Sequence, residues 1–212
     1  MADFRLIADT LKSGRAPKVK ELVQAAIDEG VQPEDILNQA LVVGMGEIGE
    51  KFKNNEVYVP EVLIAARAMN AGLSILEPLL AQKDVKPAGT VALGTVKGDL
   101  HDIGKNLVGM MLKGAGFKVI DLGVDVPPEA FVEAARQDDV QIIGMSALLT
   151  TTMPAMKETI DALKAAGLND KVKVMIGGAP VTQNFADEIG ADAYTSDAAS
   201  AAQKALELVR AS

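Results

Sequence analysis

The spacing of apolar residues changes once along this chain, close to residue 87, and this change constrains the fold more than any other feature. Before it, apolar residues recur every three or four positions, as on one face of an α-helix. After residue 60 they form one stripe: Val62, Ala66, Met69, Leu73, Leu76 and Leu80. No strand-like alternation occurs in this part of the sequence. We therefore predict an all-α bundle of about four helices as domain 1–86.

After residue 87, short apolar runs alternate with helical stretches. The runs of strand length are 90–94, 117–122, 140–145, 172–176 and 193–195. Strands that alternate with helices in this way predict a parallel, doubly wound sheet with helices on both faces. We therefore predict an α/β domain with five parallel strands over 87–212. The polar segment 83–89, which contains Pro87 and Gly89, is predicted to be a linker.

The residues that are missing exclude several classes of chemistry. The chain has 212 residues, no cysteine and a single histidine, His101. Disulfides, structural zinc sites, iron–sulfur clusters and thiol nucleophiles are therefore excluded. A transition metal could receive one imidazole from this chain, and its other ligands would have to arrive with the metal.

The charge pattern bears on partners and location. The chain carries 21 basic and 29 acidic residues, a net charge of −8, and has no long basic run. Binding to a nucleic-acid backbone is therefore not expected. The first residues lack the apolar segment of a signal peptide, and the longest apolar run, 142–149, is too short to span a bilayer. We predict a cytoplasmic protein with neither nucleic acid nor membrane as a partner.

In a doubly wound sheet, ligands bind at the carboxyl ends of the strands. The loop after the first predicted strand contains His101, with Asp99 two residues before it. A carboxylate placed there can accept the proton of one ring nitrogen and leave the other nitrogen free to bind a metal. Two other interpretations stay open, a solvated loop histidine and a general base, although no partner nucleophile is evident. Gly104 would let a bulky ligand approach the backbone.

Two later loops have suitable residues at the same edge of the sheet. The loop 146–152 contains four hydroxyl side chains, which suit a polar ligand or the cap of the following helix. Gly177 and Gly178 would let a flat group pass close to the main chain, or form a tight turn. The glycine spacing of phosphate-binding loops is absent from residues 94–98. This absence argues against a plain nucleotide-binding domain.

Together these loops read D-x-H-x-x-G, then S-x-L, then G-G. The residues are Asp99, His101, Gly104, Ser146, Leu148, Gly177 and Gly178. The pattern resembles that of corrinoid proteins and of the cobalamin module of methionine synthase. Residues 44–69 resemble the helical cap that precedes this module. The whole chain is most similar to the stand-alone corrinoid proteins of methyltransferase systems, which implies a Rossmann- or flavodoxin-like B12-binding fold for the second domain.

The resemblance implies a role for each matching residue. His101 would be the lower axial ligand to cobalt, and Asp99 would bind the far side of its imidazole. Thr152 would complete a proton relay, at a position where methionine synthase has a serine. The residues implied to contact cobalamin are Asp99, His101, Asp102, Ile103, Gly104, Ser146, Leu148, Thr150, Gly177, Gly178 and Tyr194.

The implied function is that of a methyl carrier rather than a complete enzyme. A substrate-specific methyltransferase would load the cobalt of cobalamin from a methylated amine, methanol or an aryl methyl ether. A second methyltransferase would pass the methyl group to a folate or a thiol, and a reductive activase would restore the cofactor. The alternatives are the cobalamin subunit of an adenosylcobalamin-dependent mutase, against which the helical domain counts, and a B12-dependent sensor. A sensor would need an output domain, and no basic recognition helix is visible.

Overall fold

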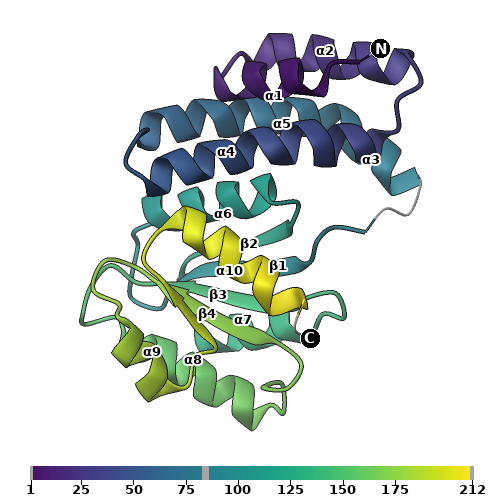
Figure 1. The fold of residues 1–212 in the computed structure, drawn as a ribbon. Helices are drawn as coiled ribbons and strands as arrows, with labels where there is room; N and C mark the ends of the chain where they lie inside the picture. Colours follow the sequence, from purple (N-terminus) through teal and green to yellow (C-terminus); the bar gives the residue numbers. More distant parts are fainter. Residues whose placement is uncertain (1, 83–85, 211–212) are drawn as a thin grey trace. The chain divides into compact units, whose positions relative to one another are not determined.

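The computed structural model describes residues 2–82 and 86–210 (Figure 1). The chain forms two compact units. The N-terminal unit comprises Met1–Pro87 together with Gly114–Gly116, and the C-terminal unit comprises Ala88–Lys113 and Phe117–Ser212. Residues 83–85 of the predicted linker lie outside the described residues.

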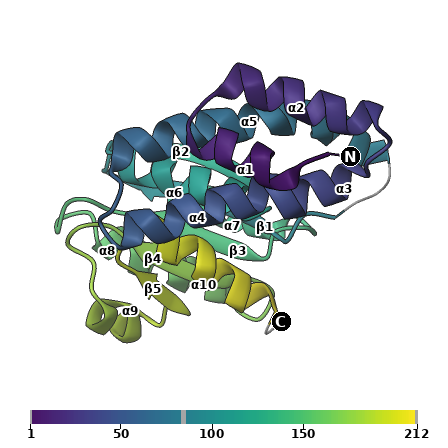
Figure 2. The ribbon, with the colours of Figure 1, turned by 45° about the horizontal axis from the view of Figure 1, so that its top comes forward.

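The N-terminal unit is helical, as predicted (Figure 2). Its elements are α1 (Phe4–Lys12), α2 (Ala16–Asp28), α3 (Pro33–Ile36), the π-helical turn η1 (Leu37–Leu41), α4 (Val42–Lys53) and α5 (Val59–Gln82). The segments α3, η1 and α4 follow one another without a break. Asp3 caps α1 by accepting a hydrogen bond from the Leu6 amide, and prolines stand in the first turns of α2 and α3.

The predicted apolar stripe lies on α5. Its members are buried except Leu73, which is half-buried, and the helix packs along α2. By length and composition α5 could also cross a membrane, although 39% of its apolar window is buried. The longest uninterrupted apolar run, 142–149, lies elsewhere, because charged residues interrupt the apolar residues of α5. A core helix of a bundle meets the same two criteria, and the buried stripe is what bundle packing requires.

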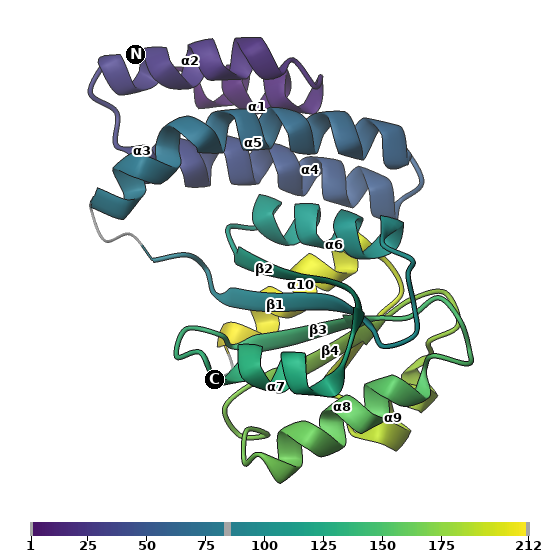
Figure 3. The same cartoon turned by 180° about the vertical axis from the view of Figure 1, so that it is seen from behind.

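The C-terminal unit contains a five-stranded parallel sheet with the order β2-β1-β3-β4-β5, which confirms the predicted doubly wound architecture. Its strands are β1 (Thr90–Val96), β2 (Lys118–Val126), β3 (Ile142–Ser146), β4 (Lys173–Gly177) and β5 (Ala193–Thr195). Its helices are α6 (Ile103–Gly114), α7 (Pro128–Arg136), α8 (Pro154–Ala165), α9 (Gln183–Ile189) and α10 (Ala198–Arg210). The helices α7, α8 and α9 share one apolar core with the strands, and Figure 3 shows α10 on the other side of the sheet.

The strand β2 is longer than predicted. The expected run ended at residue 122, whereas β2 continues to Val126. Its pairing with β1 shifts twice, so that β2 has one extra residue on each side of Gly123. Gly123 has a φ of +88°, and most of this edge strand is at least partly exposed. The apolar pattern therefore stops before the strand does, because an edge strand needs no continuous buried face.

Candidate functional site

The order of the strands reverses between β1 and β3. The chain leaves β1 for the outer strand β2 and then returns to the other side of β1 as β3. Such a switch point opens a crevice at the carboxyl ends of the two central strands. The loop 97–102 and the loop 147–153 meet there, and the loop after β4 lies beside the second of them.

The carboxylate of Asp99 joins these two loops. Its Oδ1 accepts a hydrogen bond from the His101 amide at 3.1 Å and lies 2.7 Å from the ring nitrogen Nδ1 of His101. Its Oδ2 accepts the amides of Leu148 at 2.8 Å and Leu149 at 3.3 Å, and the hydroxyl of Thr152 at 2.8 Å. Asp99 is fully buried, and every donor comes from one of the two loops. The spacing predicts the Asp99–His101 pair and the family resemblance implies a link to Thr152, and the structure brings all three side chains together.

The environment of Asp99 determines its charge. Burial alone raises the pKa of this carboxyl, because it disfavours the charged form. The hydrogen bonds from Leu148, His101 and Thr152 outweigh burial and hold the pKa of Asp99 well below its ordinary value. At neutral pH the group is therefore an anion that can only accept hydrogen bonds. It follows that Nδ1 of His101 carries the proton in this contact.

The His101 ring is fixed on one side and open on the other. With Nδ1 protonated, Nε2 of the neutral ring keeps its lone pair. The side chain is 52% exposed, although its partner Asp99 is buried. The hydroxyl of the buried Thr95 donates to the carbonyl oxygen of His101 at 2.9 Å and so fixes the backbone as well. The loop thus offers one oriented imidazole nitrogen to a ligand.

Large apolar side chains are exposed in the same loops. Within the described part of the C-terminal unit, the exposed ones are Leu100, Ile103, Val124, Leu148 and Leu149. Leu100 and Ile103 follow the carboxyl end of β1, Leu148 and Leu149 follow that of β3, and Val124 lies within β2, two residues before its end. Ile103 is 78% exposed. Apolar side chains gathered at one edge around an imidazole indicate the binding of a broad, partly apolar ligand.

The glycines of the predicted pattern differ in their surroundings. A Cβ atom on Gly178, which has a φ of +130°, would lie 1.9 Å from the carbonyl oxygen of Ala147. A Cβ atom on Gly177 would lie 3.0 Å from the carbonyl oxygen of Thr195. Backbone packing alone therefore requires Gly178 and restricts Gly177. A Cβ atom on Gly104 would meet nothing within 4 Å, which leaves open space beside the His101 loop.

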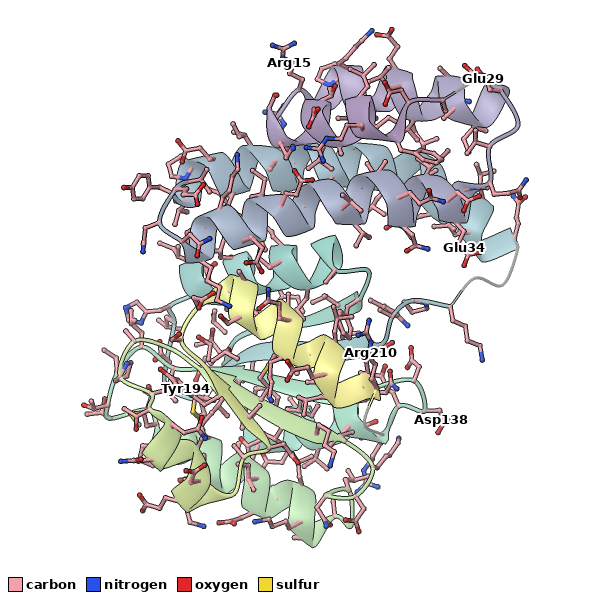
Figure 4. All side chains as sticks on the ribbon, viewed as in Figure 1. Arg15, Glu29, Glu34, Asp138, Tyr194 and Arg210 are labelled. Carbon is pink, nitrogen blue, oxygen red and sulfur yellow. The ribbon has the colours of Figure 1, made fainter. Side chains whose placement is uncertain are left out.

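The other predicted site residues are more widely distributed. Ser146 ends β3 and is half-buried, and Thr150 is exposed in the following loop. Asp102 accepts a hydrogen bond at 3.0 Å from the side chain of Asn106 in the first turn of α6. Tyr194, labelled in Figure 4, lies within β5 and packs half-buried against the apolar core. The hydrogen bonds from the loops to Asp99 do not include these four residues, and their contact with a ligand stays a prediction.

Three residues with a role in this geometry were missed in the sequence. They are Thr95, Leu149 and Asp125. The Asp125 amide donates to the carbonyl oxygen of Asp99 at 2.9 Å, and its Oδ1 accepts the Gly98 amide at 2.7 Å. The available signals were a hydroxyl near the end of an apolar strand and an aspartate two residues after Gly123. Neither signal shows which distant backbone group the residue contacts.

The residues at the switch point fit one kind of metal group. Among residues 2–82 and 86–210, no three His, Asp or Glu side chains gather to hold a bare metal ion. The site instead offers a single imidazole nitrogen, surrounded by exposed apolar side chains and, at Gly104, by open space. A metal in a large macrocycle that supplies the equatorial ligands needs only such an axial donor.

Proteins and families already described match nearly the whole length of this chain. Residues 89–206 match a family described as B12 binding domain, and residues 4–77 match a second family with the same description. The dimethylamine corrinoid protein 3 of Methanosarcina acetivorans is 45% identical over 203 residues, which cover 96% of this chain and 95% of that protein.

Two solved structures show the same fold over nearly the full length. A cobalamin-binding protein from Desulfitobacterium hafniense DCB-2 has a TM-score of 0.82 and 31% identity, and the match covers 98% of this chain and 99% of that one. The methanol:cobalamin methyltransferase complex MtaBC from Methanosarcina barkeri contains a chain with a TM-score of 0.86 and 34% identity, covering 97% of this chain and 79% of that one. These matches confirm the predicted fold class.

Proposed function

Because this chain belongs to the family of B12-binding corrinoid proteins, we propose that it carries a methyl group on cobalt between two methyltransferases. Family membership identifies the cofactor as cobalamin or a related corrinoid, which contains cobalt. The bound corrinoid supplies a cobalt centre that accepts and releases the methyl group. The observation that carries the proposal is the single imidazole at the switch point, with Nδ1 bound to Asp99 and Nε2 free.

His101 would hold cobalt from below through Nε2. The anionic Asp99 attracts the Nδ1 proton and makes Nε2 a stronger donor. The Thr152 hydroxyl lies 2.8 Å from Asp99 Oδ2 and 2.9 Å from the Leu149 carbonyl oxygen, and it has one proton to give. We assign that proton to the carboxylate, which is the stronger acceptor. The ionised Asp99 would keep the Nδ1 proton of His101 in place and leave Nε2 to hold the metal.

The remaining predicted residues would surround the corrinoid. We assign the exposed side chains of Leu100 and Ile103 to contact with the ring, where they would exclude water. Gly104 would leave space for the ring to approach the loop. Contact with the nucleotide tail is proposed for Ser146, Leu148, Thr150, Gly177, Gly178 and Tyr194. Contact with the corrinoid is proposed for Asp102.

The proposed partners follow from the relatives. The relatives include a dimethylamine corrinoid protein and a chain in a methanol:cobalamin methyltransferase complex. A methyltransferase specific for a methylated amine, methanol or an aryl methyl ether would load this chain. A second one, serving a folate or a thiol, would unload it, and a reductive activase would restore the cofactor. The chain would act in the cytoplasm as one component of this system.

The axial ligand can be tested by spectroscopy. The purified chain, reconstituted with methylcobalamin, should bind it and show the visible spectrum of a histidine-ligated corrinoid. His101→Ala should lose the ligated form, because the chain has no second imidazole. Asp170→Ala, in an exposed turn, is the matched control and should keep the wild-type spectrum. An unchanged spectrum in His101→Ala would refute the ligand assignment.

A further inference from the structure

Asp125 has an unusual backbone conformation beside the site. Its φ is +53°, in the left-handed region, and among the described non-glycine residues only Asn55 shares a positive φ. Aspartate adopts this region less readily than glycine does. A glycine would adopt this φ without strain, so the backbone conformation alone does not explain an aspartate at this position. The explanation therefore lies in the contacts of its side chain.

The second irregularity of β2 places Asp125 against the His101 loop. Between Gly94 and Val96 of β1, the partner strand advances by three residues, from Gly123 to Val126. The extra residue turns Asp125 toward the neighbouring loop, as bulges beside functional sites commonly do. Its amide donates to the Asp99 carbonyl oxygen at 2.9 Å, and its Oδ1 accepts the Gly98 amide at 2.7 Å. We call these two hydrogen bonds the Asp125 clasp.

The clasp completes the fixation of Asp99. On the β3 side, Leu148 and Thr152 hold its carboxylate. On the β2 side, Asp125 holds its backbone carbonyl and the amide of the preceding residue. Gly98 has a φ of +82°. The next amide, that of Asp99, donates to the carbonyl oxygen of Val96 at 3.1 Å, whereas the Gly98 amide donates to Asp125 Oδ1. The clasp is therefore the contact that holds the peptide between Lys97 and Gly98. Rotation of this peptide would move the Asp99 carboxylate, and with it the bonded His101 ring.

We propose that Asp125 is a positioning residue, whose clasp on Gly98 and Asp99 sets the direction in which His101 presents Nε2 to the corrinoid. The inference rests on the proposed function, because it assumes that Nε2 binds cobalt. Asp125 acts through the backbone of the loop. Its side chain bonds the Gly98 amide, while the His101 ring bonds Asp99.

The clasp itself can be tested on the chain without cofactor. Asp125→Gly removes the acceptor and suits the positive φ, so it separates the hydrogen bond from backbone strain. Asp125→Asn keeps a side-chain oxygen and tolerates the same φ. We expect exchange of the Gly98 amide hydrogen to accelerate about tenfold in the glycine variant and to stay near wild type in the asparagine variant. Asp138→Gly, at an exposed turn, is the matched control.

The positioning role needs a measurement on the ligand. With methylcobalamin bound, the visible spectrum gives the ratio of histidine-ligated to unligated corrinoid. We expect this ratio to fall about fivefold in Asp125→Gly, to recover in Asp125→Asn and to be unchanged in Asp138→Gly. Total methylcobalamin bound per chain should stay the same. Asp125→Ala, which also removes the acceptor, replaces the glycine variant if circular dichroism shows that the latter is unfolded.

Each result leads to a different conclusion. A wild-type ligation ratio in Asp125→Gly would overturn the positioning role, even if Gly98 exchange is faster. Unchanged Gly98 exchange in that variant would overturn the clasp. Failure of the wild-type chain to bind methylcobalamin would instead contradict the proposed function, and the exchange measurement would still decide whether the clasp exists.

Discussion

Asp99 concentrates the chemistry of the site in one side chain. Its carboxylate is buried, yet it stays charged because amides and a hydroxyl from two loops supply the hydrogen bonds that water would otherwise give. The same carboxylate fixes the tautomer of His101. One residue therefore stabilises the loops and orients the proposed metal ligand, and both effects should change when its charge is removed.

Replacing Asp99 by asparagine should destabilise the chain and alter its response to acid. The amide NH2 group cannot accept hydrogen bonds, so buried donors lose their partner, and we expect a loss of about 2–3 kcal/mol at pH 7. The lowered pKa of Asp99 contributes stability that is fully present above the unfolded pKa of about 4 and is lost as pH falls through the folded value. Urea unfolding from pH 7 to pH 3 measures the difference between wild type and variant.

That difference should stay constant from pH 7 to about pH 5 and shrink below about pH 4. The control is Asp102→Asn, at an exposed aspartate in the same loop. A difference that stays constant throughout the acid range would show that Asp99 is not held as an anion by its hydrogen bonds.

At the scale of elements, the sheet edge is built by parts far apart in the sequence. The loops after β1 and β3 meet only because β2 is placed outside β1.

The helices packed on the sheet hold this edge in place, and the end of α7 shows one of the contacts involved. Its last carbonyl groups have no partners within the helix, since an α-helix leaves its terminal carbonyls unpaired. The ammonium of Lys171 is their partner: it donates hydrogen bonds to the carbonyl oxygens of Ala135, Arg136 and Gln137 at 2.8–2.9 Å.

Lys171→Met should therefore weaken the C-terminal unit. The side chain keeps its length but loses the three donors and the positive charge at the helix end, so we expect a loss of about 1–2 kcal/mol. Chemical denaturation of the chain without cofactor measures it. Lys157→Met, which removes an exposed pair with Asp161 one helical turn away, should change stability by less than about 0.5 kcal/mol. Equal effects of the two substitutions would contradict the role of Lys171 as a cap.

At the scale of the whole molecule, the chain resembles a carrier. The family matches extend over both units, and the dimethylamine corrinoid protein 3 of Methanosarcina acetivorans matches nearly end to end. In the C-terminal unit, the site presents one imidazole and an apolar edge, and His101 is the only histidine of the sequence. The proposed carrier role leaves activation of the methyl donor to a partner methyltransferase.

The carrier role can be tested by adding the proteins one at a time. The reconstituted, reduced chain alone should not take up a methyl group from dimethylamine, trimethylamine or methanol. Addition of the methyltransferase specific for the right donor should convert the visible spectrum to that of the methylated corrinoid. Free cobalamin with the same methyltransferase is the control for the contribution of this chain. Methylation by the chain alone would show that it is a complete enzyme.

The sequence by itself determined the two-part organisation, the parallel strands and the loop that contains Asp99 and His101. These features depend on local periodicity and on residues close together in the chain. Only the tertiary structure decided that β2 continues to Val126, that Leu149 joins the donors to Asp99, and that Asp125 clasps the same loop. The physical reason is that these contacts join residues 26 to 50 positions apart, and the donor in each hydrogen bond is a backbone amide, a group that every residue except proline has. Which of these amides meets which acceptor depends on the strand order, the register and one left-handed backbone angle. No pattern of side chains along the sequence specifies these three features.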